Sequence, residues 1–277
     1  MTQEFVRNAL IAGSAIAIAS GAVGYFLVLR AQVFAGDALS HVAFTGTVAA
    51  ALAGIDLRLG LFTATVGVGV SFAVLGGRRT SGRAAGAQTV VDDTAIGVVF
   101  VWVLGLGVLF LDLVNRGSGG ANGVIASRTL FGSIFTLTEN QTEVAVLVAV
   151  GIVAGLAAIG RPLLFATTAP ETAAARGVPV ALLGAAFLGL LGLDAGEATQ
   201  AVGALLLLGL LAAPAGAAVR LVANPAIGVG LSAGFALASV WIGTTVAYLA
   251  PSLPPSSAII GVAVAIYAGA FILTARR

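Results

Sequence analysis

The sequence of 277 residues contains no cysteine, no lysine, one histidine and one methionine, and only 9% of its residues are charged. Without cysteine, the chain cannot form disulfides, thiolate nucleophiles or iron–sulfur clusters. Without lysine, it cannot build a P-loop nucleotide site or a Schiff base with retinal or pyridoxal. With one histidine, a zinc hydrolase site of the usual multi-histidine type is not expected.

What the chain has instead is apolar side chains. Hydrophobic residues make up 59% of the sequence and the mean hydropathy is +1.10, whereas soluble domains are about 45–50% apolar and about 25% charged. The thirteen arginines exceed the eleven acidic residues by only two, and no basic stripe with interleaved aromatics indicates nucleic-acid binding. The composition is that of a protein embedded in membrane lipid.

Nine apolar stretches approach the length of about 20 residues that a membrane-spanning helix needs. They are residues 8–29, 38–54, 59–76, 92–114, 142–160, 179–193, 198–218, 225–249 and 256–275. We therefore predict an all-α polytopic transmembrane helix bundle of about nine spans, or eight, since 179–193 is short and 37–54 carries ionisable residues. Residues 117–141 are expected to form a loop with a short interfacial or re-entrant piece. No second domain is evident, so residues 1–277 form a single transmembrane domain.

The distribution of arginine predicts the orientation, because short cytoplasmic loops are enriched in positive charge. Alternating the nine spans places nine arginines on one side: Arg30, Arg78, Arg79, Arg83, Arg161, Arg176, Arg220, Arg276 and Arg277. The other side holds Arg7, Arg58, Arg116 and Arg128. The N-terminus is thus predicted outside and the C-terminus in the cytoplasm. The first stretch is too long for a signal peptide and is expected to remain uncleaved. Asp194 and Glu197 are assigned to an external loop between the sixth and seventh spans.

Ionisable residues within spans are candidates for function, and the best pair is Asp37 and His41. Four residues apart, they share one face of a helix, and a carboxylate with an imidazole suits Zn(II), Mn(II) or Fe(II). Two ligands make a weak site, as a conduction pathway requires. The alternative is that Asp37 caps the helix and His41 is a packed neutral side chain.

A second cluster lies in residues 169–178. Pro170 at a helix start, Glu171 in the first turn and Gly177 at the end predict a two-turn helix. Such a polar helix between two spans either docks a soluble partner or lies idle in the interface. Further along, Pro214 lies inside a span, where it is expected to kink the helix.

Glycine is also abundant, with 38 residues. Spacings such as Gly151/Gly155, Gly230/Gly234 and Gly261/Ala265/Gly269 are compatible with close helix packing and equally with exposure to lipid.

In order along residues 5–275, these segments resemble the membrane-permease subunits of zinc/manganese-type ATP-binding-cassette importers. The resemblance rests on Gly36-Asp37-Ala38-Leu39-Ser40-His41, Asp92-Asp93-Thr94-Ala95-Ile96-Gly97, Leu130-Phe131-Gly132, Pro170-Glu171 with Ala173 and Gly177-Val178, and Val202-Gly203 with Leu205-Leu206 through Pro214-Ala215 and Ala217. The sequence departs from the family at Thr45, where proline is usual, and at Ala169, where aspartate is common.

The resemblance implies a homodimeric permease in the bacterial cytoplasmic membrane that imports Mn(II), Zn(II) or Fe(II) by alternating access. Asp37 and His41 would be transient metal ligands, and residues 169–178 would be the cytoplasmic coupling helix, with Pro170, Glu171, Ala173 and Gly177. The expected partners are a second copy of the chain, two cytoplasmic ATP-binding subunits, an extracytoplasmic metal-binding protein and membrane lipid, with no resident cofactor and no nucleic acid. ATP hydrolysis belongs to the partner chains, so this chain is not itself an enzyme. The alternatives are a permease for a metal chelate or cofactor, and a secondary transporter or channel acting alone.

Overall fold

The computed structural model describes residues 2–79, 93–117, 129–132, 134–250 and 252–275, and all the regular secondary structure in these residues is helical. The elements are α1 (Thr2–Leu29), α2 (Val33–Ala53), α3 (Leu57–Arg79), α4 (Asp93–Gly117), the 3₁₀ turn η2 (Ile134–Thr136), α6 (Glu139–Thr168), α7 (Pro170–Ala175), α8 (Val180–Val202), α9 (Leu207–Leu221), α10 (Pro225–Leu249) and α11 (Pro255–Ala275). The prediction of an all-α chain is confirmed. Each predicted span overlaps a described helix, and the span 198–218 falls mainly on the short α9.

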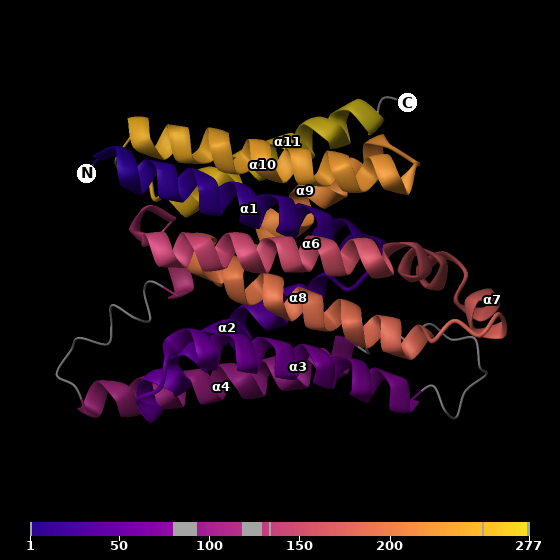
Figure 1. Cartoon of the computed structure of the whole chain (residues 1–277), viewed down its shortest axis with the longest axis horizontal. Helices are drawn as coiled ribbons and strands as arrows, with labels where there is room; N and C mark the ends of the chain where they lie inside the picture. Colours follow the sequence, from indigo (N-terminus) through magenta and orange to yellow (C-terminus); the bar gives the residue numbers. More distant parts are fainter. Residues whose placement is uncertain (1, 80–92, 118–128, 133, 251, 276–277) are drawn as a thin grey trace.

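Seven of the described helices are long and apolar enough to cross a membrane: α1, α3, α4, α6, α8, α10 and α11. The 15-residue α9 is apolar but shorter, and α2, which carries Asp37 and His41, is not among the seven. The long helices lie side by side along the long axis of the molecule, and α7 projects at one end (Figure 1).

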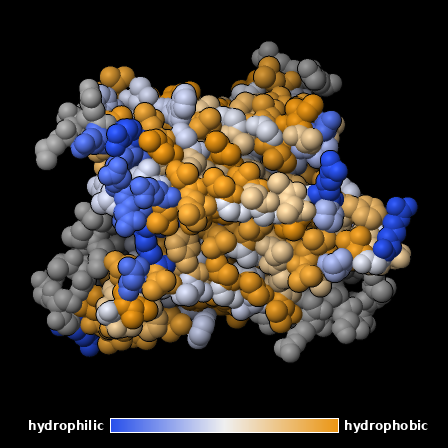
Figure 2. Space-filling view, viewed as in Figure 1, coloured by the Kyte–Doolittle hydropathy of each residue, from blue (hydrophilic) through white to orange (hydrophobic). Residues whose placement is uncertain are grey.

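The surface supports a membrane location. Figure 2 shows a broad hydrophobic band across the middle of the molecule, with hydrophilic residues gathered towards its two ends. Large side chains are exposed on the outer helices, among them Trp102, which is 66% exposed, and Leu147, which is 74% exposed. Exposed apolar area on this scale is stable only in contact with lipid or another apolar surface.

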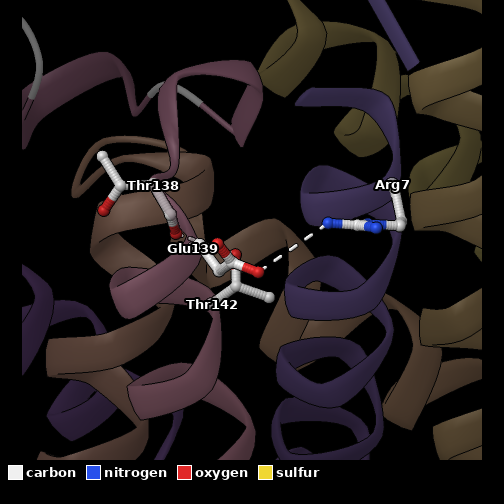
Figure 3. A network of polar contacts seen from close by, with 4 residues as sticks. All are labelled: Arg7, Thr138, Glu139 and Thr142. Atoms are coloured by element: carbon white, nitrogen blue, oxygen red, sulfur yellow. Dashed lines mark hydrogen bonds and ion pairs between the residues drawn. The ribbon is translucent and has the colours of Figure 1, made fainter. Parts of the chain in front are cut away.

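Helix α6 begins at a capping box. The Thr138 hydroxyl accepts a hydrogen bond from the backbone N–H of Gln141, and the Gln141 side chain accepts one from the backbone N–H of Thr138. Next to this start, Arg7 of α1 lies 3.9 Å from the Glu139 carboxylate (Figure 3). Both side chains are largely exposed, so the pair contributes little to stability. The helix then continues through Pro162 to Thr168, beyond the predicted end of this span.

The boundary between the sixth and seventh predicted spans is wrong. Residues 194–197 are not an external loop, because α8 runs unbroken through them to Val202. The helix stops only at Gly203, which has a φ of +94°, a backbone conformation open mainly to glycine. Asp194 and Glu197 interrupt the hydropathy of the sequence, but they do not interrupt the helix, since their side chains find polar partners inside the bundle.

The predicted loop 117–141 can be compared only in part, since residues 118–128 and 133 lie outside the described residues. The described portion includes η2, whose Ile134 is 1% exposed and packs against α1 at Gly13. This short piece therefore packs against the bundle, and whether it is interfacial or re-entrant stays a prediction. Among the residues named above, Asp92, Arg83, Arg128, Arg276 and Arg277 also lie outside the described residues.

The three predicted glycine faces pack little within the protomer. Among their glycines, only Gly155 has a neighbour close to the position of an added Cβ: Leu190 Cδ2, at 3.0 Å. The close approaches occur at other glycines. A Cβ on Gly46 of α2 would lie 2.6 Å from the Gly60 oxygen of α3, and one on Gly60 would lie 2.6 Å from the Gly46 oxygen. These two glycines therefore allow α2 and α3 to touch backbone to backbone.

Candidate metal-ion site and coupling helix

Helix α2 carries the predicted metal pair. It is an unbroken α-helix from Val33 to Ala53, so Asp37 and His41 lie one turn apart on the same face. Both side chains are partly exposed, while most of the helix around them is buried. The structure does not use Asp37 as the helix N-cap, because that position belongs to Gln32 and has no side-chain hydrogen bond.

The imidazole of His41 is oriented by an aromatic neighbour. Its ring packs edge-to-face on Phe100 of α4, with the ring centroids 5.1 Å apart, and Phe100 in turn packs on Phe34 at 6.0 Å. The His41 Nδ1 atom is buried and has no hydrogen-bond partner among the described residues. A buried ring nitrogen without a partner costs free energy, and a metal ligand bond is one way of recovering it.

Thr45 stands where the resembled family usually has proline. Its hydroxyl donates a 3.0 Å hydrogen bond to the Val103 carbonyl of α4, and α2 passes through this position without a break. Where proline would favour a break in the helix, threonine instead makes a hydrogen bond between α2 and α4. This bond holds α2, with the predicted metal pair, against α4, which carries Phe100.

The pattern at residues 169–178 corresponds to a helix in the structure. Helix α7 begins with Pro170 at its first turn and includes Glu171 and the fully buried Ala173. Gly177 ends it with a φ of +80°, and the Val178 N–H bonds back to the Ala173 carbonyl at 3.0 Å, which is the Schellman pattern. Ala169 occupies the N-cap and supplies no side-chain hydrogen bond, because alanine lacks the oxygen that aspartate would offer.

The predicted kink residue, Pro214, is buried within α9.

Gly203, the residue at which α8 ends, lies against Gly132 of the segment 129–132. The two glycines are so close that neither could carry a Cβ without a shift of the backbone. The Ala204 N–H donates a 2.9 Å hydrogen bond to the Thr129 carbonyl at the same place. Two motifs that are far apart in the sequence, Leu130-Phe131-Gly132 and Val202-Gly203, are therefore in contact in the structure.

Two acidic residues inside the bundle were missed as candidates. Asp194 and Glu197 are each 2% exposed and lie three residues apart on α8. Asp194 accepts a 3.0 Å hydrogen bond from the Ser20 hydroxyl of α1 through Oδ1, while its Oδ2 has no partner in the part of the chain that the structure describes. The Gln200 side chain donates to Glu197 at 3.4 Å. Asp194 and Glu197 are three residues apart between two apolar stretches. This spacing was the sequence signal that could have indicated that both lie on one face of a helix.

Gln200 connects this pair to a pocket of about 410 Å³. The lining includes residues at the starts of α3 and α6, and both helices begin at the end of the molecule opposite α7 (Figure 1). The pocket is lined by Thr47, Asp56, Leu57, Arg58, Leu61, Thr129, Thr136, Leu137, Thr138, Gln141 and Gln200. The Arg58 Nε and Nη2 atoms are buried and make no hydrogen bond to any residue that the structure describes. The described residues contain no group of three or more histidine, cysteine, aspartate or glutamate side chains that could hold a metal ion.

The chain is similar in sequence to a known family of membrane transport proteins. The sequence pattern of the ABC 3 transport family matches residues 2–274. The chain is 30% identical to the manganese import system permease protein ScaB of Streptococcus parasanguinis over 78% of this chain and 71% of that protein. It is 26% identical to the manganese transport system membrane protein MntC of Listeria monocytogenes over 100% of this chain and 93% of that protein.

A solved structure has the same architecture. PsaBC from Streptococcus pneumoniae, in complex with a Fab, contains a chain that matches with a TM-score of 0.80 and 25% sequence identity. The match covers 97% of this chain and 91% of that chain. The arrangement of helices described above is thus shared over nearly the whole length of both proteins.

Proposed function

The chain belongs to the ABC 3 transport family, and we propose that it is the permease subunit of an ATP-driven importer of divalent transition-metal ions. It is a multi-pass membrane protein, and ATP hydrolysis belongs to a partner. Mn(II) is the proposed substrate, with Zn(II) and Fe(II) as the other ions that the donor set suits. The observation that carries the proposal is the Asp37–His41 pair on one face of α2, with a buried His41 nitrogen that no described residue hydrogen-bonds.

The end of the bundle that carries α7 is the proposed cytoplasmic side. Helices α1, α7 and α9 end at that end of the bundle, next to Arg30, Arg176 and Arg220 (Figure 1). At the opposite end α1 and α3 begin and α4 ends, near Arg7, Arg58 and Arg116. This arrangement supports a topology of nine spans, with α2 and the short α9 counted among them, an external N-terminus and a cytoplasmic C-terminus. The polar pocket with Arg58 then opens on the external side, where a metal-binding protein would deliver the ion.

The proposed assembly contains two copies of the permease and two ATP-binding subunits. Two ligands from one chain hold a divalent ion weakly, and a second copy facing the first would supply two more, so that four protein ligands would share the ion. The metal is transported cargo, and no resident cofactor is proposed. Helix α7, with Pro170, Glu171, Ala173 and Gly177, is the proposed contact with the ATP-binding subunits.

The test is ATP-dependent uptake by the complex reconstituted in liposomes with its ATP-binding subunits and its external metal-binding protein. We expect radioactive Mn(II) to accumulate only with ATP, and Asp37→Asn or His41→Ala to reduce accumulation to background while the complex still assembles. Normal uptake in both variants would refute the site. Uptake by the chain alone, without ATPase or ATP, would instead identify a secondary transporter or channel, and uptake of a metal chelate that free Mn(II) does not compete with would identify a chelate importer.

A further inference from the structure

The turn between α1 and α2 is held by an arginine that reaches two other helices. The Arg30 Nε donates a 3.0 Å hydrogen bond to the Gln32 side chain, and its Nη1 donates a 3.2 Å hydrogen bond to the Thr167 hydroxyl at the end of α6. The guanidinium also lies over the ring of Phe187 on α8, 5.5 Å from the centroid. One side chain therefore connects the start of α2 to both α6 and α8.

The turn itself is tightly specified. The Ala31 N–H bonds to the Val28 carbonyl at 3.1 Å and the Gln32 N–H to the Leu27 carbonyl at 3.0 Å, the Schellman pattern that ends a helix. Ala31 has a φ of +53° and is the only non-glycine residue with positive φ among the described residues. Such a conformation costs an alanine free energy, and it is maintained here by its surroundings. The Gln32 side chain that accepts from Arg30 is 2% exposed.

The other ends of the Arg30 contacts flank α7. Thr167 lies three residues before Pro170, and Phe187 lies in the third turn of α8, the helix that follows α7. Ala173 of α7 is fully buried, so α7 is packed against its neighbours. Burial lowers the pKa of Arg30 from its usual value, but an arginine remains charged across physiological pH.

We propose that Arg30 is a positioning residue that transmits displacement of α7 to α2, and thereby to Asp37 and His41. The inference rests on the proposed function, in which the ATP-binding subunits move α7. Displacement of α7 carries the end of α6 and the start of α8 with it, because α7 is joined to both by short connections. Arg30 converts that movement into a pull on the first turn of α2, since its three contacts fix the turn. Asp37 follows Gln32 by five residues on the same rigid helix.

The experiment compares uptake with ATP hydrolysis in the same reconstituted complex. In Arg30→Gln we expect the number of Mn(II) ions imported per ATP hydrolysed to fall about tenfold, since two charge-assisted contacts are lost. Mn(II) binding to the purified permease, measured by electron paramagnetic resonance, should remain within about threefold of wild type, because Asp37 and His41 are unchanged. Arg30→Lys keeps the charge but not the planar fork, and should give an intermediate ratio.

Arg220 provides a matched control. It also lies near the α7 end and packs over two aromatic rings, those of Tyr267 and Phe271, at 5.5 and 4.8 Å. These contacts join α9 to α11 and do not involve α2. Arg220→Gln should therefore leave the ratio of uptake to hydrolysis unchanged.

Thr167→Val removes the hydroxyl that accepts from Arg30, together with the bond of that hydroxyl to the Leu163 carbonyl of its own helix. It keeps the shape of the side chain, so it tests the inference even if Arg30→Gln fails to fold. We expect it to lower the ratio about threefold. An unchanged ratio in Arg30→Gln or in a folded Thr167→Val complex would overturn the inference, as would equal loss of Mn(II) binding and uptake. Failure of the wild-type complex to import Mn(II) would refute the proposed function, which the variants do not test.

Discussion

The Ser20 hydroxyl on α1 donates a 3.0 Å hydrogen bond to Asp194 Oδ1 on α8, across 174 positions of sequence. Ser20 is fully buried and Asp194 is 2% exposed. The second oxygen of Asp194 has no partner, so this bond is the only one that the described residues make to the carboxyl group. A polar group this deep in an apolar bundle is expensive, which makes its one donor important.

Removal of that donor should destabilise the protein. We expect Ser20→Ala to reduce the free energy of unfolding by about 1–3 kcal/mol, because Asp194 then stays buried without any hydrogen bond. The measurement is unfolding of the purified permease in detergent. Ser71→Ala is the control, since the Ser71 hydroxyl is exposed and bonds only to the Gly67 carbonyl of its own helix. Equal stability of the two variants would show that the buried bond contributes nothing.

The positive φ of Ala31 predicts a stabilising substitution. Glycine adopts this conformation without the clash that alanine suffers, so Ala31→Gly should raise the free energy of unfolding by about 1 kcal/mol. Gly54, which ends α2 with a φ of +68°, is the reverse case, and Gly54→Ala should lower stability by a similar amount. Unfolding measurements on the two variants should therefore shift in opposite directions, and shifts of the same sign would contradict the assignment.

Metal uptake should depend on pH through His41. A histidine must be neutral to bind a metal ion, and imidazole groups titrate between about pH 5 and pH 8. Protonation at low pH therefore removes the ligand, and uptake should fall as the external pH falls through this range. His41→Gln offers a neutral donor that does not titrate, so its lower uptake should vary less with pH. The comparison is made after dividing uptake by the ATPase rate at each pH, and identical profiles would exclude His41 as the titrating group.

Two glycines of α3 should respond oppositely to alanine. At Gly60 an added Cβ would lie 2.6 Å from the Gly46 oxygen of α2, whereas at Gly67 it would meet nothing within 4 Å. Gly60→Ala should therefore cost about 1–3 kcal/mol of stability by separating α2 from α3, while Gly67→Ala should add about 0.5–1 kcal/mol through helix propensity. Because α2 carries Asp37 and His41, Mn(II) uptake should fall in Gly60→Ala and persist in Gly67→Ala. Similar behaviour of the two variants would argue against the close contact.

Several local features could be predicted from the sequence because neighbouring residues determine them. Pro170 and Gly177 mark the start and end of α7 through the conformations that proline and glycine favour. The four-residue spacing of Asp37 and His41 places both on one face of any α-helix. The roles of these residues in metal binding and coupling remain predictions for the experiments above.

Other features depended on distant residues and could not be predicted in this way. Asp194 and Glu197 look like loop residues in a hydropathy profile, yet Ser20 and Gln200 provide partners that allow them to remain within α8. The spacing of glycines also did not predict which of them pack against another helix. A Cβ added at Gly230 or Gly234 would have no neighbour within 4 Å. Spacing describes a helix face, whereas contact requires a second helix at that face.

The sequence by itself determined that this protein lies in a membrane, because a chain with 9% charged residues cannot cover a water-facing surface. It also determined that the chain cannot supply a P-loop, since it has no lysine. Only the tertiary structure decided which of the scarce polar groups meet: Ser20 with Asp194, and Arg30 with Thr167. The physical reason is that hydropathy and helix periodicity are local properties, whereas buried polar side chains are satisfied by partners that folding brings from far along the chain.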